Sequence, residues 1–381
     1  MSVNGKSNKE ISRVLGIRKP TIIEWLRCLT YKDNRGWKDG VMRKYSILEE
    51  QRICELKKQR TEQKKYFVGS DYIRMDYAKA FPGDPLPSNW FVEKVVRNND
   101  LQTAKPKSKK KGGSAYLLYP VEAIRQLGIV QQSADFIGKK YIDNHSDPIN
   151  IFSTNYYSPF KLYQIQPIFA AKIAFMLPVL TKLWRDFPIP DVFRIDNGLQ
   201  FRGSGSGKKF LSPFLKFVLN LNVIPLFGAP HKPWTNPHIE GHNKVFNDKV
   251  WGRNRFTCLE QINIECERFN GESLELFNFK YRNNLIFIKR KRYLTEKSKI
   301  KLDKLTTTEN RKIYFIRFVE NRDTQNNSFI VILNEKVIIP QQYDHQFVFV
   351  ECDIEKSKLN IFSEYQKNIK QIHQIKFKLN L

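Results

Sequence analysis

The sequence predicts an α/β core that lies between an N-terminal all-α region and a small C-terminal β-rich region, in a chain of 381 residues. Three observations support this fold class. Residues 1–104 place apolar side chains at helical spacing, residues 128–280 alternate between strand-like and helix-like runs, and residues 310–381 hold short runs rich in β-branched and aromatic residues. A chain of this length exceeds one ordinary domain of about 100–200 residues, so several domains are expected.

The N-terminal region is predicted to bind DNA through helix-turn-helix units. In the first candidate, residues 9–29, an apolar face at helical spacing marks one helix and Gly16 permits the turn into the next. A second and weaker candidate spans residues 47–96, where Ser88 is a plausible helix cap. The alternative for both is a small basic helical bundle without a DNA-binding role. The basic residues expected on the DNA side of the first unit are Arg18, Lys19 and Arg27.

Two basic stretches, residues 105–127 and residues 281–309, are predicted to be linkers. The first contains Lys109, Lys110 and Lys111 beside proline and glycine, with no apolar periodicity. Such a stretch is either a solvated tether or a segment that contacts phosphates along a DNA path.

The middle of the chain, residues 128–280, has the pattern of a mixed sheet flanked by helices. Three strand-like runs come first, and helices then alternate with two more strands. Pro178 lies inside the first long helical stretch and is expected to kink it. The strands are expected near 131–137, 148–156, 160–166, 192–195 and 222–227, and the helices near 167–186, 211–220 and 238–250.

Three acidic residues of this core occupy positions that a sheet could bring together. Asp135 lies within the first strand, Asp196 follows the fourth strand, and Glu240 lies in the first turn of the last helix. Converging carboxylates are hard oxygen ligands suited to Mg²⁺ or Mn²⁺, and two such ions about 3.5–4 Å apart catalyse phosphoryl transfer. Taken singly, each acid has a simpler reading as a strand-edge residue, a hairpin-turn residue or a complement to a helix dipole.

The residues around the second and third acids resemble a known family. The run IDNGLQF at 195–201 and the run LNVIPLFGAPHKPWTNPHIEGHN at 221–243 are similar to the catalytic core of retroviral-integrase-like DDE transposases. The resemblance covers about residues 128–275, and it implies an RNase H-like fold, two Mg²⁺ or Mn²⁺ ions, and the cutting and joining of transposon-end DNA. It also implies that the three acids are both the catalytic residues and the metal ligands.

Two features depart from the family pattern. The acids Asp196 and Glu240 are 44 positions apart (240 − 196), which is more than the usual spacing, and the insert at 203–209 accounts for the excess. The His/Cys zinc module of retroviral integrases is absent, because the six histidines and five cysteines lack its spacing.

Other charged side chains lie near the third acid in the sequence and could bind a ligand. Lys232 and Lys244 are candidates for DNA contact, and Lys244 could equally pair with Glu240 four residues earlier. His238 and His242 are spaced as a possible zinc pair, but without a third ligand nearby we expect them to contact DNA or to be exposed to solvent.

Residues 310–381 are predicted to form a small β-barrel. Several short apolar runs are separated by turn residues such as Asn326 and Asn334, a spacing typical of small β domains. In the resembled family a C-terminal β-barrel often assists DNA binding or assembly, so the resemblance implies the same role here.

The charge of the chain indicates a polyanionic partner. The formal net charge is +27, of which +13 lies in residues 1–130, +5 in residues 131–280 and +9 in residues 281–381. No apolar run is long enough to cross a membrane and no secretory signal is evident, so we expect a cytoplasmic protein without a membrane partner. Five unpaired cysteines agree with a reducing compartment.

Together these features predict a DNA transposase that cleaves transposon ends in double-stranded DNA and transfers the 3′-OH into target DNA. Because two ends must be joined, a homo-multimer on DNA is expected, and the need for an accessory ATPase stays open. The first alternative is a domesticated, transposase-derived DNA-binding regulator without catalysis. The second alternative is a simple RNase H-like nuclease. The two basic flanks speak against it, because they favour a protein that organises long DNA.

Overall fold

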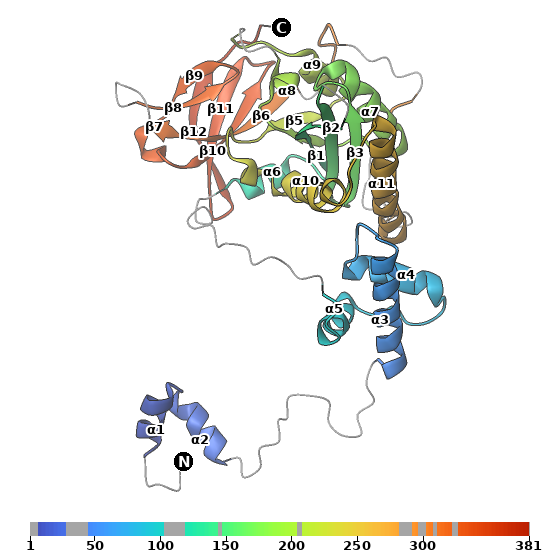
Figure 1. The fold of residues 1–381 in the computed structure, drawn as a ribbon. Helices are drawn as coiled ribbons and strands as arrows, with labels where there is room; N and C mark the ends of the chain where they lie inside the picture. Colours follow the sequence, from blue (N-terminus) through green and yellow to red (C-terminus); the bar gives the residue numbers. More distant parts are fainter. Residues whose placement is uncertain are drawn as a thin grey trace.

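The structure is a computed structural model, and it confirms the predicted mixed α/β architecture (Figure 1). N-terminal helices precede a large sheet flanked by helices, and antiparallel strands follow at the C-terminus. None of the helices in the part of the chain described here combines the length and the apolar character that crossing a membrane requires. The described residues are 7–27, 45–102, 119–143, 147–203, 208–281, 292–295, 302–307, 311–321 and 327–380.

The first predicted helix pair is present. Helix α1 (Asn8–Leu15) begins at Ser7, whose hydroxyl accepts a hydrogen bond from the Glu10 backbone N–H at 3.3 Å in a capping box. It ends at Gly16, whose φ of 66° is the left-handed conformation that glycine adopts without strain. Helix α2 (Lys19–Arg27) follows directly, so the predicted sharp turn is confirmed.

Three further helices form a separate bundle with its own apolar core. They are α3 (Ile47–Glu62), α4 (Ser70–Ala80) and α5 (Asn89–Asn98). Ser88 caps α5 as predicted, because its hydroxyl accepts a hydrogen bond from the Phe91 N–H at 3.2 Å. The side chains buried between these helices include Ile53, Ile73, Tyr77, Phe91 and Val92. The helices of the second candidate unit are therefore confirmed, while their role in DNA binding stays a prediction.

The five predicted strands of the core form one side of a nine-stranded sheet, in the order β12-β11-β10-β6-β5-β4-β1-β2-β3, with β3 at the edge. Strand β1 pairs antiparallel with β2 and parallel with β4, and β4 pairs parallel with β5. The carboxyl ends of β4 and β5 therefore lie at the same edge. These strands are β1 (Gln131–Lys140), β2 (Ile149–Ser158), β3 (Leu162–Ile168), β4 (Val192–Ile195) and β5 (Ile224–Phe227).

The C-terminal strands do not form the separate β-barrel that the sequence predicts. Strand β6 pairs parallel with β5, so β6, β10, β11 and β12 continue the core sheet, while β7, β8 and β9 form a second, three-stranded sheet. The free backbone groups along the β5 edge require partners, and β6 supplies them. The strands are β6 (Lys312–Phe318), β7 (Glu320–Asn321), β8 (Ser328–Ile332), β9 (Glu335–Ile338), β10 (Phe347–Asp353), β11 (Lys358–Tyr365) and β12 (Asn368–Lys376).

Helices cover both faces of the sheet because residues along each strand alternate in direction. On one face Phe193 packs against Trp184, with ring centroids 5.6 Å apart, beneath α7 and α9. On the other face α10 and α11 cover β1, β2 and β3, and α6 covers β4, β5 and β6. Pro178 lies inside α7, which is assigned as one continuous helix. The helices are α6 (Val121–Gln126), α7 (Ile173–Asp186), α8 (Leu199–Arg202), α9 (Pro213–Asn220), α10 (Pro237–Lys249) and α11 (Leu259–Tyr281).

Described parts of both predicted linkers pack against the core. In the first, residues 121–126 form α6, because Ala123 and Ile124 are buried against the sheet. In the second, the Arg292 guanidinium donates a hydrogen bond to the Leu221 carbonyl at 2.6 Å. Lys109, Lys110 and Lys111 lie outside the described residues.

Candidate active site

The structure brings the three predicted acids to one cavity of about 460 Å³ at the carboxyl ends of β4 and β5. Asp135 comes from β1, Asp196 follows β4, and Glu240 comes from the first turn of α10. Three elements that are distant in sequence thus converge on one space, as the resemblance implies.

Asp135 is held by two hydrogen bonds. Its Oδ1 accepts the backbone N–H of Phe136 at 2.7 Å, and its Oδ2 accepts the Nδ2 of Asn243 at 2.9 Å. Asn243 lies on α10 three residues after Glu240 and is 6% exposed. It therefore ties the helix that carries the third acid to the strand that carries the first. Sequence reasoning missed Asn243, although its position one helical turn from Glu240 places it on the adjoining helix surface.

Asp196 begins a turn that closes on itself and on the neighbouring strand. Its Oδ1 accepts the Gly198 N–H at 3.0 Å, and the Nδ2 of Asn197 donates to the Gly228 carbonyl at 2.7 Å. Because β4 leads into α8 and lies parallel to β5, the simpler interpretation of these residues as a β-hairpin turn is wrong. The Asp-Asn-Gly sequence instead fixes the ends of two parallel strands beside the cavity.

Arg317, on β6, is a second residue of the site that sequence reasoning missed. It is 5% exposed, and its guanidinium donates to the Oδ1 of Asn197 at 2.9 Å and to the Gly228 carbonyl at 3.0 Å. A third hydrogen bond, from its Nε, reaches the Val331 carbonyl at 2.8 Å. A C-terminal strand thus supports the turn that presents Asp196. No local pattern marks Arg317, because its neighbours are those of an ordinary strand.

The electrostatics of the cavity reflect the convergence of like charges. Burial and then the carboxylate of Asp196 raise the pKa of Asp135 to about 7, and Glu240 adds to the rise. Loss of contact with water raises the pKa of Asp196 and of Glu240 as well. Burial and the nearby charge of Arg202 lower the pKa of Arg317 to about 9.

Helix α10 is anchored to the sheet by consecutive residues. The Nδ1 of His242 and the Oγ of Ser153 share a hydrogen bond of 2.9 Å, and Ser153 is the cross-strand partner of Asp135 in the β1–β2 pair. His242 is 1% exposed and stacks on Tyr163 with ring centroids 4.4 Å apart. The expectation that His242 contacts DNA or solvent is therefore wrong, and it is a packed core residue. Burial lowers the pKa of His242 to about 3.

The predicted DNA-contact residues are spread over the molecule. Lys232 lines the acid cavity, with its Nζ 4.2 Å from the ring centroid of Phe318. The exposed Lys244 pairs with Asp248 at 3.5 Å rather than with Glu240. Arg18 and Lys19 are exposed at the start of α2, and Arg27 ends that helix.

The donor chemistry of the cavity fits a divalent cation. No Lys or Arg among the described residues forms an ion pair with Asp135, Asp196 or Glu240, so their charges are left for another cation. Within the described part of the chain, however, no three His, Cys, Asp or Glu side chains are arranged closely enough to hold one ion. Joint coordination by the three acids therefore requires their side chains to rotate toward one another.

Comparison with known proteins finds a distant likeness among solved structures. No protein-family model and no curated protein matches the sequence. Among solved structures, the chain is similar to one in the cryoEM structure of the simian T-cell lymphotropic virus intasome in complex with PP2A regulatory subunit B56 gamma. The identity is 12% and the TM-score is 0.32, over 83% of this chain and 95% of that chain. A likeness at this level does not identify the function of the chain.

Proposed function

We propose that the chain is a DDE-type DNA transposase that hydrolyses a phosphodiester at a transposon end and then joins the new 3′-OH to target DNA. The observation that carries the proposal is the convergence of Asp135, Asp196 and Glu240 on one cavity, where no Lys or Arg of the described residues forms an ion pair with any of them. The resemblance of the motifs around Asp196 and Glu240 to DDE transposases supports the same reaction class.

In this proposal the three carboxylates hold Mg²⁺ or Mn²⁺. A divalent cation bound there supplies positive charge where the phosphoryl-transfer transition state accumulates negative charge. The protein contributes position. Asn243 fixes Asp135 relative to α10, and Asn197 with Arg317 fixes the turn that presents Asp196. Lys232 and Arg202 line the same cavity and offer positive charge to a bound DNA strand.

The proposed reaction has two steps. In the first, a water oxygen attacks the phosphorus at the transposon end, the bond to the 3′ oxygen breaks, and a 3′-OH and a 5′-phosphate result. In the second, that 3′-OH attacks a phosphodiester of target DNA and displaces its 3′ oxygen. Both steps exchange one P–O bond for another, so no redox partner or energy-rich cofactor is required.

The test incubates the full chain with Mg²⁺ or Mn²⁺ and labelled duplexes that carry candidate transposon ends. We expect 3′-end nicking and strand-transfer products from the wild type and none from Glu240→Gln. Asp248→Asn is the matched control, because Asp248 is an exposed acid of the same helix and its one ion pair among the described residues is with Lys244. Equal activity in Glu240→Gln and wild type would overturn the assignment of Glu240. DNA binding without nicking by the wild type would favour the regulator without catalysis.

A further inference from the structure

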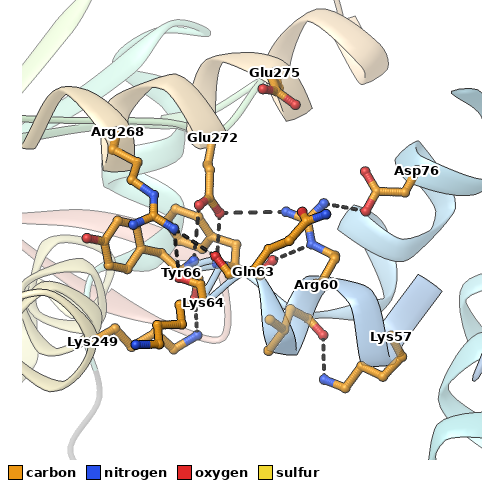
Figure 2. A network of polar contacts seen from close by, with 12 residues as sticks. Lys57, Arg60, Gln63, Lys64, Tyr66, Asp76, Lys249, Arg268, Glu272 and Glu275 are labelled. Carbon is orange, nitrogen blue, oxygen red and sulfur yellow. Dashed lines mark hydrogen bonds and ion pairs between the residues drawn. The ribbon is translucent and has the colours of Figure 1, made fainter. Parts of the chain in front are cut away.

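The α3–α5 bundle is fixed to the core through a buried carboxylate. Glu272 of α11 is 3% exposed and accepts the backbone N–H groups of Tyr66 and Phe67, each at 3.1 Å. The guanidinium of Arg60, at the end of α3, lies 3.6 Å from the same carboxylate and 2.5 Å from Asp76 of α4. Figure 2 shows Arg60 and Glu272 converging between α3 and α11. The bundle and the core therefore meet in one defined arrangement.

A cavity of about 290 Å³ lies beside this contact and is lined mainly by cations. Lys64 comes from the turn after α3, Lys249 from the end of α10, Arg253 from the 3₁₀ turn at 251–253, and Arg268 from α11. Among the described residues of the lining Glu265 is the only acid, and it lies 3.8 Å from Arg268. Four positive charges thus face one negative charge.

Backbone carbonyls hold two of these cations in place. The Nζ of Lys249 donates to the Tyr66 carbonyl at 2.5 Å, and Arg268 donates to the carbonyls of Gln63 and Lys64 at 2.9 and 3.1 Å. Burial and the charge of Arg253 lower the pKa of Lys249, as expected for a cation crowded by others.

One carboxylate, that of Glu265, pairs with only one of the four cations, Arg268. Lys64, Lys249 and Arg253 have no ion-pair partner within the described part of the chain. Converging lysine and arginine donors that outnumber the acids beside them are the pattern that binds phosphate oxygens.

The position of the cavity suits the backbone of DNA. Glu240 and Lys249 lie at the two ends of α10, and nine residues at 1.5 Å each place them about 13.5 Å apart along the helix. That distance is roughly four base-pair steps of a duplex. A duplex bound at the acid cavity can therefore present another of its phosphates to this second cavity.

We propose that the cavity lined by Lys64, Lys249, Arg253 and Arg268 is a seat for a backbone phosphate of duplex DNA, held jointly by the α3–α5 bundle and the core. The inference rests on the proposed function only in taking DNA as the ligand. Because both units supply donors, DNA bound in the seat also stabilises their contact.

The test measures binding of the full chain to a fluorescent duplex over a range of salt concentrations. The variant Lys64→Asn/Arg253→Gln removes two exposed cations of the seat and leaves the carbonyl-bound pair intact, and asparagine tolerates the φ of 52° at position 64. The control Lys182→Gln/Arg185→Gln removes the same charge from exposed positions of α7, on the opposite face of the sheet. We expect about tenfold weaker binding for the seat variant, with a salt slope smaller by about one, and little change for the control.

Three outcomes would overturn the proposal. In the first, the seat variant binds DNA as tightly as wild type does. In the second, the control variant weakens DNA binding as much as the seat variant does. In the third, inorganic phosphate stabilises the wild type although the seat variant still binds DNA normally. The last would assign the seat to free phosphate. The proposed function can fail separately from this proposal. If wild type binds DNA with the predicted dependence on the seat residues but never nicks it, the phosphate site stands and the assignment as a transposase does not.

Discussion

Replacement of His242 by glutamine should remove a specific part of the acid sensitivity of the fold. The His242 imidazole is buried between Tyr163 and Phe269, and burial lowers its pKa from 6.5 to about 3. The unfolded chain therefore takes up a proton below pH 6.5 that the folded chain refuses, so the free energy of unfolding falls as the pH falls. Between pH 7.5 and pH 5 the expected loss is about 2 kcal/mol, at about 1.36 kcal/mol for each pH unit below 6.5.

The assay is urea unfolding in EDTA at the two pH values, for wild type, His242→Gln and the exposed neighbour His238→Gln. All titrating groups other than position 242 are the same in wild type and His242→Gln, so the difference in pH dependence between these two proteins isolates position 242. We expect His242→Gln to lose about 2 kcal/mol less than wild type on acidification. His238→Gln should show the same effect to a smaller extent, because burial and the charge of Arg194 also lower the pKa of His238. His242→Phe, which suits the aromatic surroundings, serves if the glutamine variant does not fold. Equal pH dependence in wild type and both position-242 variants would refute the reasoning.

Three further outcomes follow from the described contacts. Arg317→Met should reduce end cleavage about tenfold or more at an unchanged circular dichroism spectrum, since a hydrogen bond from a charged donor is worth about 1.5–3 kcal/mol; full activity would exclude a positioning role. Gly241→Ala should raise the urea-unfolding free energy by about 0.5–1 kcal/mol, because its Cβ meets open space within a helix, and a loss would contradict this. Arg60→Met should lower that free energy by about 3–5 kcal/mol by leaving Glu272 buried without its cation, and an unchanged free energy would contradict this.

The acids of the cavity could be predicted because their patterns are local. Asp196 follows a short apolar strand and Glu240 opens a helix after a proline-containing loop, and both signals lie within a few residues of the acid. Burial of His242 could also have been predicted, because it follows Ile239 by three residues and precedes Phe246 by four, on the apolar face of α10. The sequence interpretation treated it as a polar residue and overlooked that periodicity.

Pairing between distant strands could not be predicted in the same way. The run that forms β6 is recognisable as a strand from its own residues, but nothing in it specifies β5 as its partner. Arg317 therefore went unnoticed, since it acts on Asn197, 120 positions earlier in the chain. The error about a separate barrel and the missed site residue have the same cause, which is that strand propensity carries no information about which edge a strand joins.

Helix α10 fixes the distance between the acid cavity and the cationic cavity, and this fixed distance indicates that the two cavities act on one ligand. Its first turn carries Glu240, its middle is tied to β1 and β2 by Asn243 and His242, and its end carries Lys249 at the bundle junction. Because two buried polar contacts hold the middle of this helix to the sheet, we expect its two ends to keep a fixed position relative to each other. The spacing between the acid cavity and the cationic cavity is therefore set by the helix rise, and both cavities must accommodate the same rigid backbone if DNA is the ligand. A ligand smaller than about four base pairs could occupy only one of them.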